Sequence, residues 1–260
     1  MNKPLKAGSA LEDRFRVADL LGQSERSAAY LAADLDQGGS WVLVWESLDL
    51  FRMKQEPRGL VNYLEQEERH YLLLRLEGQD LGLIFEAAGV VAPDWAALWM
   101  AQICDGVGQW HARPGAPTVC LTHGDIGLAA LRLMATAQAI LPSCDLLSQP
   151  EAAVVPGQSL VFTAPEKVYQ RQLTPRSDVY ALGGALYCLV TGAQPPGPRA
   201  IEEGQAELVR PRKIQRKLSR RLERVILKSL RLDPRKRYET ARQFGFELDR
   251  CVPGRLRRQK

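Results

Sequence analysis

The sequence contains no CxxC pair, no apolar run long enough to cross a bilayer, and no hydrophobic stretch behind its N-terminus. The last of these absences argues against a secretory signal. The five cysteines are scattered and odd in number, which argues against a disulfide framework. We therefore expect reduced thiols, packed as small hydrophobic side chains in a cytosolic protein.

The charge is unevenly distributed along a chain of ordinary composition. Of 260 residues, 45% are hydrophobic and 25% charged, so the chain can bury the core of one large domain or of two lobes. Residues 210–260 hold 19 Lys/Arg and 5 Asp/Glu, a net charge of +14 against −9 for the rest. This basic quarter can face phosphate, an acidic protein or an anionic membrane surface, or it can be a solvated face without a specific ligand.

The first third of the chain has the short apolar segments and turn signals of strands. After a flexible lead-in over residues 1–10, a three-stranded meander is expected, followed by a short Glu-rich helix and two further strands. The expected strands are 15–17, 29–32, 41–44, 70–76 and 81–85, the helix spans 59–69, and the last two strands are joined by a hairpin turn at 77–80.

After Pro93 the apolar spacing becomes helical. The first helix carries a stripe of Trp95, Trp99, Ile103, Val107 and Trp110. Ser177 is expected to be the N-cap of a buried helix that ends at Gly192. Two more apolar stripes run over 218–230 and 241–251. The sequence thus predicts an α+β arrangement with a small N-terminal sheet lobe containing one helix, and a larger, mainly helical C-terminal lobe.

Four segments, in this order, resemble the eukaryotic-type protein kinase family, in particular bacterial Ser/Thr kinases. His-Gly-Asp at 123–125 is similar to the catalytic loop, and Ala-Pro-Glu at 164–166 to the family's APE motif. Ser-Asp-Val-Tyr-Ala-Leu-Gly at 177–183 resembles the helix that anchors the larger lobe, and Asp-Pro-Arg-Lys-Arg-Tyr at 233–238 the late DPxxR motif. The resemblance extends from about Leu11 to Cys251.

The resemblance implies a two-lobe kinase-like domain over 11–252. The N-lobe would span 11–86, the hinge 86–91 and the C-lobe 92–252, followed by a basic tail at 253–260. It also implies structural roles for four residues. Glu166 should pair with Arg237, and Asp178 should bond toward His123 and its backbone.

The same resemblance implies that much of the catalytic apparatus is altered. Asp125 occupies the position of the catalytic base. Trp45 stands at the strand lysine, Gly127 at the catalytic-loop lysine and Ala130 at the magnesium-binding asparagine. Asp145 is the candidate metal ligand, or else a loop aspartate. A relict nucleotide pocket would be lined by Gly22, Ser24, Ser27, Leu43, Glu86 and Ala88, with Leu43 partly filling the adenine slot.

These substitutions predict a pseudokinase that acts as a protein-interaction, scaffold or regulatory module without ATP or Mg²⁺. One alternative is an atypical active Ser/Thr kinase that uses ATP and Mg²⁺ and recruits Arg26 or Lys54 for the phosphates. Another is a nucleotide-binding switch without catalysis.

The expected partners are proteins of unknown identity, with an acidic protein or an anionic membrane surface at the basic C-terminal region. Nucleic acid is not expected, because the aromatic residues lie in core stripes. The expected location is cytoplasmic, either free or as the cytoplasmic domain of a membrane-anchored protein. The basic end of the chain is similar to the stretch that precedes a membrane span in many bacterial Ser/Thr kinases.

Overall fold

The structure is a computed structural model. It describes residues 4–23, 27–37, 40–47, 60–66, 69–75, 79–81, 85, 89–112, 132–133, 139–140 and 162–257. The chain divides into two compact units. One comprises residues 1–92 with 132–138, and the other comprises residues 93–131 with 139–260.

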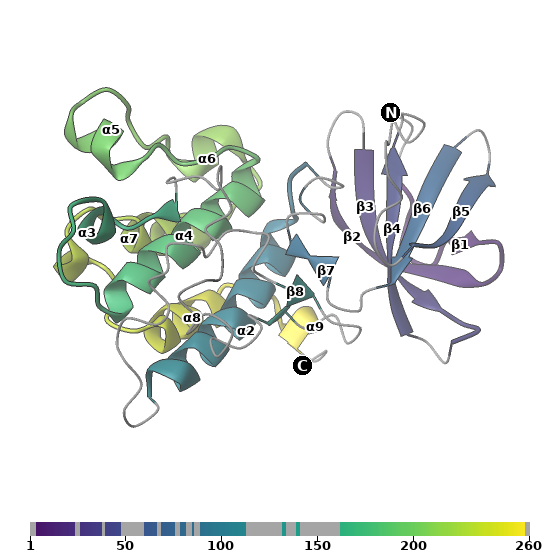
Figure 1. Cartoon of the computed structure of the whole chain (residues 1–260). Helices are drawn as coiled ribbons and strands as arrows, with labels where there is room; N and C mark the ends of the chain where they lie inside the picture. Colours follow the sequence, from purple (N-terminus) through teal and green to yellow (C-terminus); the bar gives the residue numbers. More distant parts are fainter. Residues whose placement is uncertain are drawn as a thin grey trace. The chain divides into compact units, whose positions relative to one another are not determined.

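The first unit is built on an antiparallel sheet of six strands in the order β1-β2-β3-β4-β6-β5 (Figure 1). The strands β2, β3 and β4 form the expected meander, since each pairs with its neighbour in sequence. The strands are β1 (Ala10–Leu11), β2 (Phe15–Gln23), β3 (Ser27–Asp34), β4 (Ser40–Ser47), β5 (Leu60–Gln66) and β6 (Arg69–Arg75). The short strands β7 (Gln79–Asp80) and β8 (Arg132–Leu133) also pair antiparallel.

One face of this sheet covers a hydrophobic core because side chains alternate along each strand. Tyr30 in β3 and Val44 in β4 are fully buried in it, and Phe15 and Tyr71 pack in the same cluster. At the end of β3, Asp34 receives two hydrogen bonds from Arg14, Nε to Oδ1 at 2.9 Å and Nη2 to Oδ2 at 2.8 Å. The Arg14 guanidinium lowers the pKa of Asp34 and outweighs the opposing effect of burial.

The expected helix over 59–69 is wrong. Leu60–Gln66 is the strand β5, which pairs with β6 as a hairpin. Leu64 is buried while Glu65 is exposed, so this segment follows the period of a strand despite its glutamates. The expected strand over 81–85 is also wrong, because Leu81 and Phe85 are helical. The hairpin turn expected at 77–80 is not a turn at its last two residues, because Gln79–Asp80 is the strand β7.

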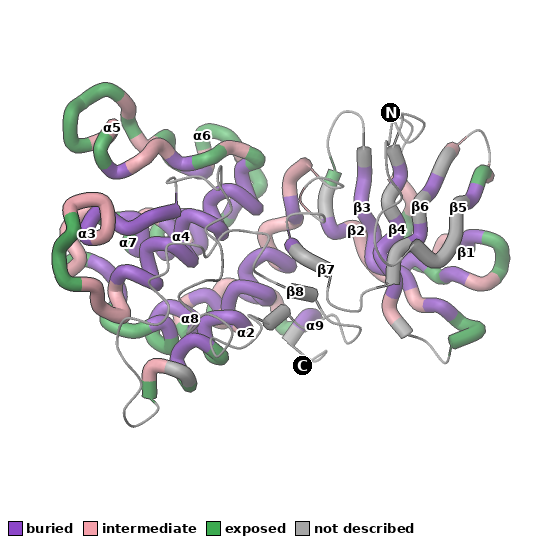
Figure 2. The backbone as a smooth tube through the Cα atoms, viewed as in Figure 1, coloured by how far each residue is buried: buried purple, intermediate pink, exposed green. Residues whose placement is uncertain are grey.

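The second unit is mainly helical. Its elements are α2 (Pro93–His111), β9 (Ala139–Ile140), α3 (Pro165–Val168), α4 (Pro175–Thr191), α5 (Pro198–Glu202), α6 (Pro211–Ile214), α7 (Arg220–Ser229), the 3-10 turn η5 (Pro234–Lys236), α8 (Ala241–Asp249) and α9 (Gly254–Arg257). Every residue of α4 from Ser177 to Thr191 is buried (Figure 2). This helix contacts α2, α3, α6, α7, α8 and η5, so it is the core of the unit.

The stripe expected on the first helix is confirmed where the structure describes it. Trp95, Trp99, Ile103 and Val107 are all at most 2% exposed. The rings of Trp95 and Trp99 lie 5.6 Å apart and are tilted by 44°. The buried cysteines Cys104 and Cys188 behave as the expected small hydrophobic side chains, and burial raises the pKa of both thiols.

The ends of α4 follow from local chemistry. The helix starts two residues before Ser177, so the expected N-cap is wrong. The N-cap is Thr174. Ser177 lies one turn inside, and its Oγ accepts a hydrogen bond from the Thr174 N–H at 3.2 Å. At the other end, Gly192 has φ +74° and its N–H donates to the Cys188 carbonyl at 2.9 Å, which confirms it as the stop.

Close packing between α4 and α7 depends on Gly183. A Cβ added at Gly183 would overlap the side chain of Ser229. Ser229 is fully buried, and its Oγ donates to the Ile226 carbonyl at 2.7 Å. The absence of a side chain at Gly183 therefore sets how closely these two helices approach.

Candidate functional site

The strand β4 (Ser40–Ser47) contains Trp45, the residue expected at the strand-lysine position. It is the sequence Ser-Trp-Val-Leu-Val-Trp-Glu-Ser and contains neither Lys nor Arg. Within it, the backbone of Trp45 pairs with Ala29 of β3 on one side and Leu72 of β6 on the other. Glu46 is the only ionisable residue of this strand.

Glu46 is the centre of a buried hydrogen-bonded group that sequence reasoning missed. Arg69 of β6 donates to it through Nε and Nη2, each at 2.6 Å, and Tyr30 donates its hydroxyl at 2.8 Å. Burial and the hydrogen bond to Glu46 raise the pKa of Tyr30. The sequence signal was a lone acid at the end of an apolar strand, which requires a partner when it is buried.

Arg69 therefore forms a hydrogen-bonded ion pair with Glu46. Its side chain is 11% exposed, and that of Glu46 is 7% exposed. The arginine cation neutralises the one charge on β4. To release it for a phosphate would leave a buried carboxylate unpaired.

Two residues of the expected nucleotide pocket can be placed in detail. Leu43 is fully buried in β4, where its backbone pairs with Leu31 and Leu74. Gly22 lies in β2 and pairs with Ala29 next to a register shift. The backbone of Ser27 begins β3. The remaining pocket positions Ser24, Glu86 and Ala88 lie outside the described residues.

The catalytic-loop positions Asp125, Gly127 and Ala130 also lie outside the described residues, as do His123 and Asp145. Their roles stay predictions. Among the residues that the structure describes, no group of three or more His, Cys, Asp or Glu side chains is arranged to hold a metal ion.

Asp178 anchors the end of α2 to the start of α4. Its carboxylate Oδ2 lies 2.7 Å from Nε2 of His111, the last residue of α2. Asp178 is 1% exposed, and burial raises its pKa while the bond to His111 opposes the rise. The expected partner His123 is not described, and sequence reasoning did not identify His111. The available signal was a histidine at the end of an amphipathic helix.

The second imidazole nitrogen of His111 is buried as well. Nδ1 of His111 is buried and has no hydrogen bond in the described part of the chain. The segment that contains Asp125 begins shortly after His111. The hydrogen bond to Asp178 therefore holds the C-terminal end of α2, which is where that segment begins.

Glu166 and Arg237 form the expected buried ion pair. Nη1 and Nη2 of Arg237 donate to the two carboxylate oxygens of Glu166 at 2.8 and 2.9 Å. Ser177 adds a third hydrogen bond to Oε1 of Glu166 at 2.8 Å. Burial raises the pKa of Glu166, but the hydrogen bonds from Arg237 outweigh it, and the net pKa lies below the ordinary value.

The remaining donors of Arg237 bind backbone carbonyls. Nε donates to Arg231 at 2.6 Å, and the two terminal nitrogens also donate to Arg176 and Leu232, each at 2.9 Å. The guanidinium carbon lies 4.8 Å from the ring centroid of Tyr180. This one side chain thereby joins α3, the start of α4 and the loop between α7 and η5.

The chain is similar in sequence to bacterial serine/threonine protein kinases. The chain is 25% identical to the serine/threonine-protein kinase PknB of Mycobacterium tuberculosis over 95% of its own length and 44% of the relative's. It is 28% identical to a probable serine/threonine-protein kinase of Corynebacterium efficiens over 69% of its length and 29% of that protein's. The chain thus spans less than half the length of these relatives. No family model matches it.

Solved structures match the fold. The apo form of PpkA-294 is 16% identical, with a TM-score of 0.51 over 94% of this chain and 99% of that one. A double mutant of the Mycobacterium tuberculosis PknI kinase domain is 17% identical, with a TM-score of 0.51 over 95% of this chain and 99% of that one. The protein has a protein-kinase-like fold. It is a distant homologue of bacterial serine/threonine protein kinases.

Within the described residues, no helix combines the length and the apolar character that a membrane span requires.

Proposed function

We propose that this kinase-like domain does not transfer phosphate and instead acts through the proteins that it binds. The observation that carries the proposal is the composition of β4, where Trp45 stands in place of a cation and the only charge is the carboxylate of Glu46. Phosphoryl transfer depends on positive charge placed around the phosphates, and this strand supplies none.

The buried side chains around this strand support the same conclusion. Leu43 is fully buried where a nucleotide pocket would need an accessible surface. Arg69 is held by Glu46 through two hydrogen bonds and is not available to a phosphate. Removing one preorganised charge-stabilising group from an enzyme typically costs about 10²–10³ in rate. The sequence changes at Gly127 and Ala130 would add to that loss.

The structural anchors of the larger unit support an interaction role. The pairs Glu166–Arg237 and Asp178–His111 are both buried and fully formed. They keep the shape of the helical unit, which a binding module needs as much as an enzyme does. A retained fold whose strand β4 carries no cation for phosphate is the combination expected of a pseudokinase.

Two measurements on the same sample test this proposal. We expect excess MgATP to leave the melting temperature unchanged and no labelled phosphate to appear on the protein or on a generic protein substrate. An active bacterial serine/threonine kinase domain provides the positive control. A melting shift without incorporation would indicate a nucleotide switch. Incorporation that disappears in Asp125→Ala would establish an atypical kinase and overturn the proposal.

A further inference from the structure

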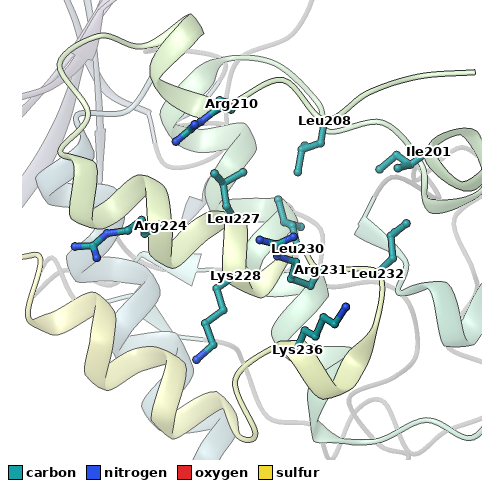
Figure 3. A pocket seen from close by; sticks show the side chains of 10 residues that line it. All are labelled: Ile201, Leu208, Arg210, Arg224, Leu227, Lys228, Leu230, Arg231, Leu232 and Lys236. Carbon is teal, nitrogen blue, oxygen red and sulfur yellow. The ribbon is translucent and has the colours of Figure 1, made fainter. Parts of the chain in front are cut away.

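A hollow of about 990 Å³ lies on the helical unit, between α5, the loop after it, α7 and η5 (Figure 3). Half of its lining is aliphatic and comes from three segments of the chain. The aliphatic residues are Ile201, Leu208, Leu227, Leu230 and Leu232. Leu230 is buried and the other four are half-buried, so the hollow has an apolar floor below the surface.

The other half of the lining is cationic. It consists of Arg210, Arg224, Lys228, Arg231 and Lys236, all exposed, and no acid lines the hollow among the residues that the structure describes. Figure 3 shows Arg210, Arg224, Lys228 and Lys236 above, to the left of and below the aliphatic side chains. The rim therefore presents positive charge on three sides of an apolar floor, and Arg231 lies next to Leu230.

Two of these cations have partners within the unit. Arg210 donates to Glu223 at 3.0 Å, and the ammonium of Lys228 lies 4.2 Å from the ring centroid of Tyr238. The side chains of Arg224 and Arg231 make no hydrogen bond or ion pair with any residue that the structure describes. Free cations of this kind can pair with a ligand without first breaking an internal contact.

We propose that this hollow binds an acidic segment of a partner protein that inserts leucine-like side chains between its carboxylates. The apolar floor requires aliphatic side chains, and the cationic rim selects Asp and Glu around them. The inference deepens the proposed interaction role by naming the chemistry of the partner. A volume of about 990 Å³ is at the upper end for small-ligand pockets, and it has room for several side chains of a peptide.

Other anions fit the hollow less well. A free phosphate would pair with the rim but leave the aliphatic floor without a partner. An anionic bilayer is met by apolar side chains that protrude into it, whereas these are sunk below a charged rim. Both remain outcomes that the experiment distinguishes.

The test compares the unaltered chain with a charge-reversed rim, Arg224→Glu/Arg231→Glu/Lys236→Glu. A random peptide library is selected on each protein, and the peptides enriched only on the unaltered chain are sequenced. We expect them to combine acidic residues with Leu, Ile or Phe. Their affinity, measured by fluorescence anisotropy, should fall by about tenfold or more on the charge-reversed rim, because each acid then meets a like charge.

The matched control reverses three exposed cations of the same basic region that do not line the hollow, Lys213→Glu/Arg216→Glu/Lys217→Glu. It should bind the selected peptides as the unaltered chain does. Equal loss in both variants would show nonspecific charge attraction and overturn the proposal. Thermal melting of each variant shows that its fold is intact.

A separate variant, Leu208→Ser, tests the apolar floor without changing charge. It should weaken the same peptides while leaving any binding of phosphate or of phosphatidylserine vesicles unaltered. Selected peptides without acidic and aliphatic enrichment would contradict the proposal. The proposal would also be contradicted if the rim bound phosphatidylserine vesicles or inorganic phosphate but no peptide. None of these readouts uses ATP. A failure of peptide binding would therefore overturn the proposal for this hollow alone, whereas phosphate incorporation would overturn the proposed function alone.

Discussion

Replacing Arg237 by alanine removes a guanidinium whose donors are all used within the fold. It makes five hydrogen bonds, two to Glu166 and three to backbone carbonyls. Arg237 is 3% exposed and Glu166 is 5% exposed, so water cannot replace these bonds. Removing one partner of a buried ion pair typically costs about 3–5 kcal/mol, because the other charge stays buried and unpaired. We expect Arg237→Ala to lower the free energy of unfolding by this amount.

Urea unfolding followed by tryptophan fluorescence and circular dichroism measures this loss. The control is Arg235→Ala in the same turn, since the side chain of Arg235 is 90% exposed and its contact with Asp233 is 3.4 Å long. An exposed pair of this kind contributes about 0–1 kcal/mol. If Arg237→Ala costs no more than Arg235→Ala, the argument that this pair anchors the helical unit is refuted.

The same pair predicts a dependence on pH. The folded pKa of Glu166 lies below its ordinary value, so its contribution is complete above the ordinary carboxyl pKa and is lost as the pH falls through the lower folded pKa. The difference in unfolding free energy between the unaltered chain and Arg237→Ala should therefore shrink as the pH falls through the carboxyl range, because Glu166 protonates first in the variant. A difference that stays constant from neutral pH into acid would show that the carboxylate of Glu166 is not what Arg237 stabilises.

Two further stability predictions concern glycine packing and the buried group on β4. Gly183→Ala should lower the free energy of unfolding by about 1–3 kcal/mol, because the new methyl group overlaps Ser229. Its control is Gly106→Ala, which should leave the stability unchanged or raise it, because no atom lies within 4 Å of the added methyl group. Equal melting temperatures for the two variants would contradict this prediction. Glu46→Leu should cost about 3–5 kcal/mol because Arg69 loses its buried acceptor. Asp36→Ala, which removes an exposed partner of Arg14, is its control in the same denaturation assay.

Sequence reasoning predicted best the long elements, in which the apolar spacing repeats many times. The stripe from Trp95 to Val107 and the buried helix around Leu182 were predictable because many positions repeat the same spacing. The contact between Glu166 and Arg237 was predictable only through the resemblance to kinases. Nothing in the chain between the two residues indicates that they meet.

The errors occurred where local composition and tertiary pairing disagree. Residues 60–66 contain helix-favouring glutamate, but hydrogen bonds to β6 and the burial of Leu64 make them a strand. Serine favours the N-cap and so predicts that position for Ser177, yet the helix begins earlier and the Ser177 hydroxyl donates to Glu166. The ends of helices are the least predictable part of such patterns.

The parts of the site that sequence reasoning missed are contacts between residues distant in the chain. Tyr30, Glu46 and Arg69 come from three strands, and only the register of the sheet brings them together. His111 and Asp178 likewise meet because α2 packs against α4. The basic composition of residues 210–260 was evident, but the grouping of Arg224 and Arg231 with five aliphatic side chains in one hollow was not.

The most direct test of the central claim is transfer of labelled phosphate from ATP in the presence of Mg²⁺, by the unaltered chain and by Asp125→Ala. Because β4 offers no cation and Arg69 is held by Glu46, we predict the same background signal from both proteins. Incorporation by the unaltered chain that Asp125→Ala abolishes would contradict the account.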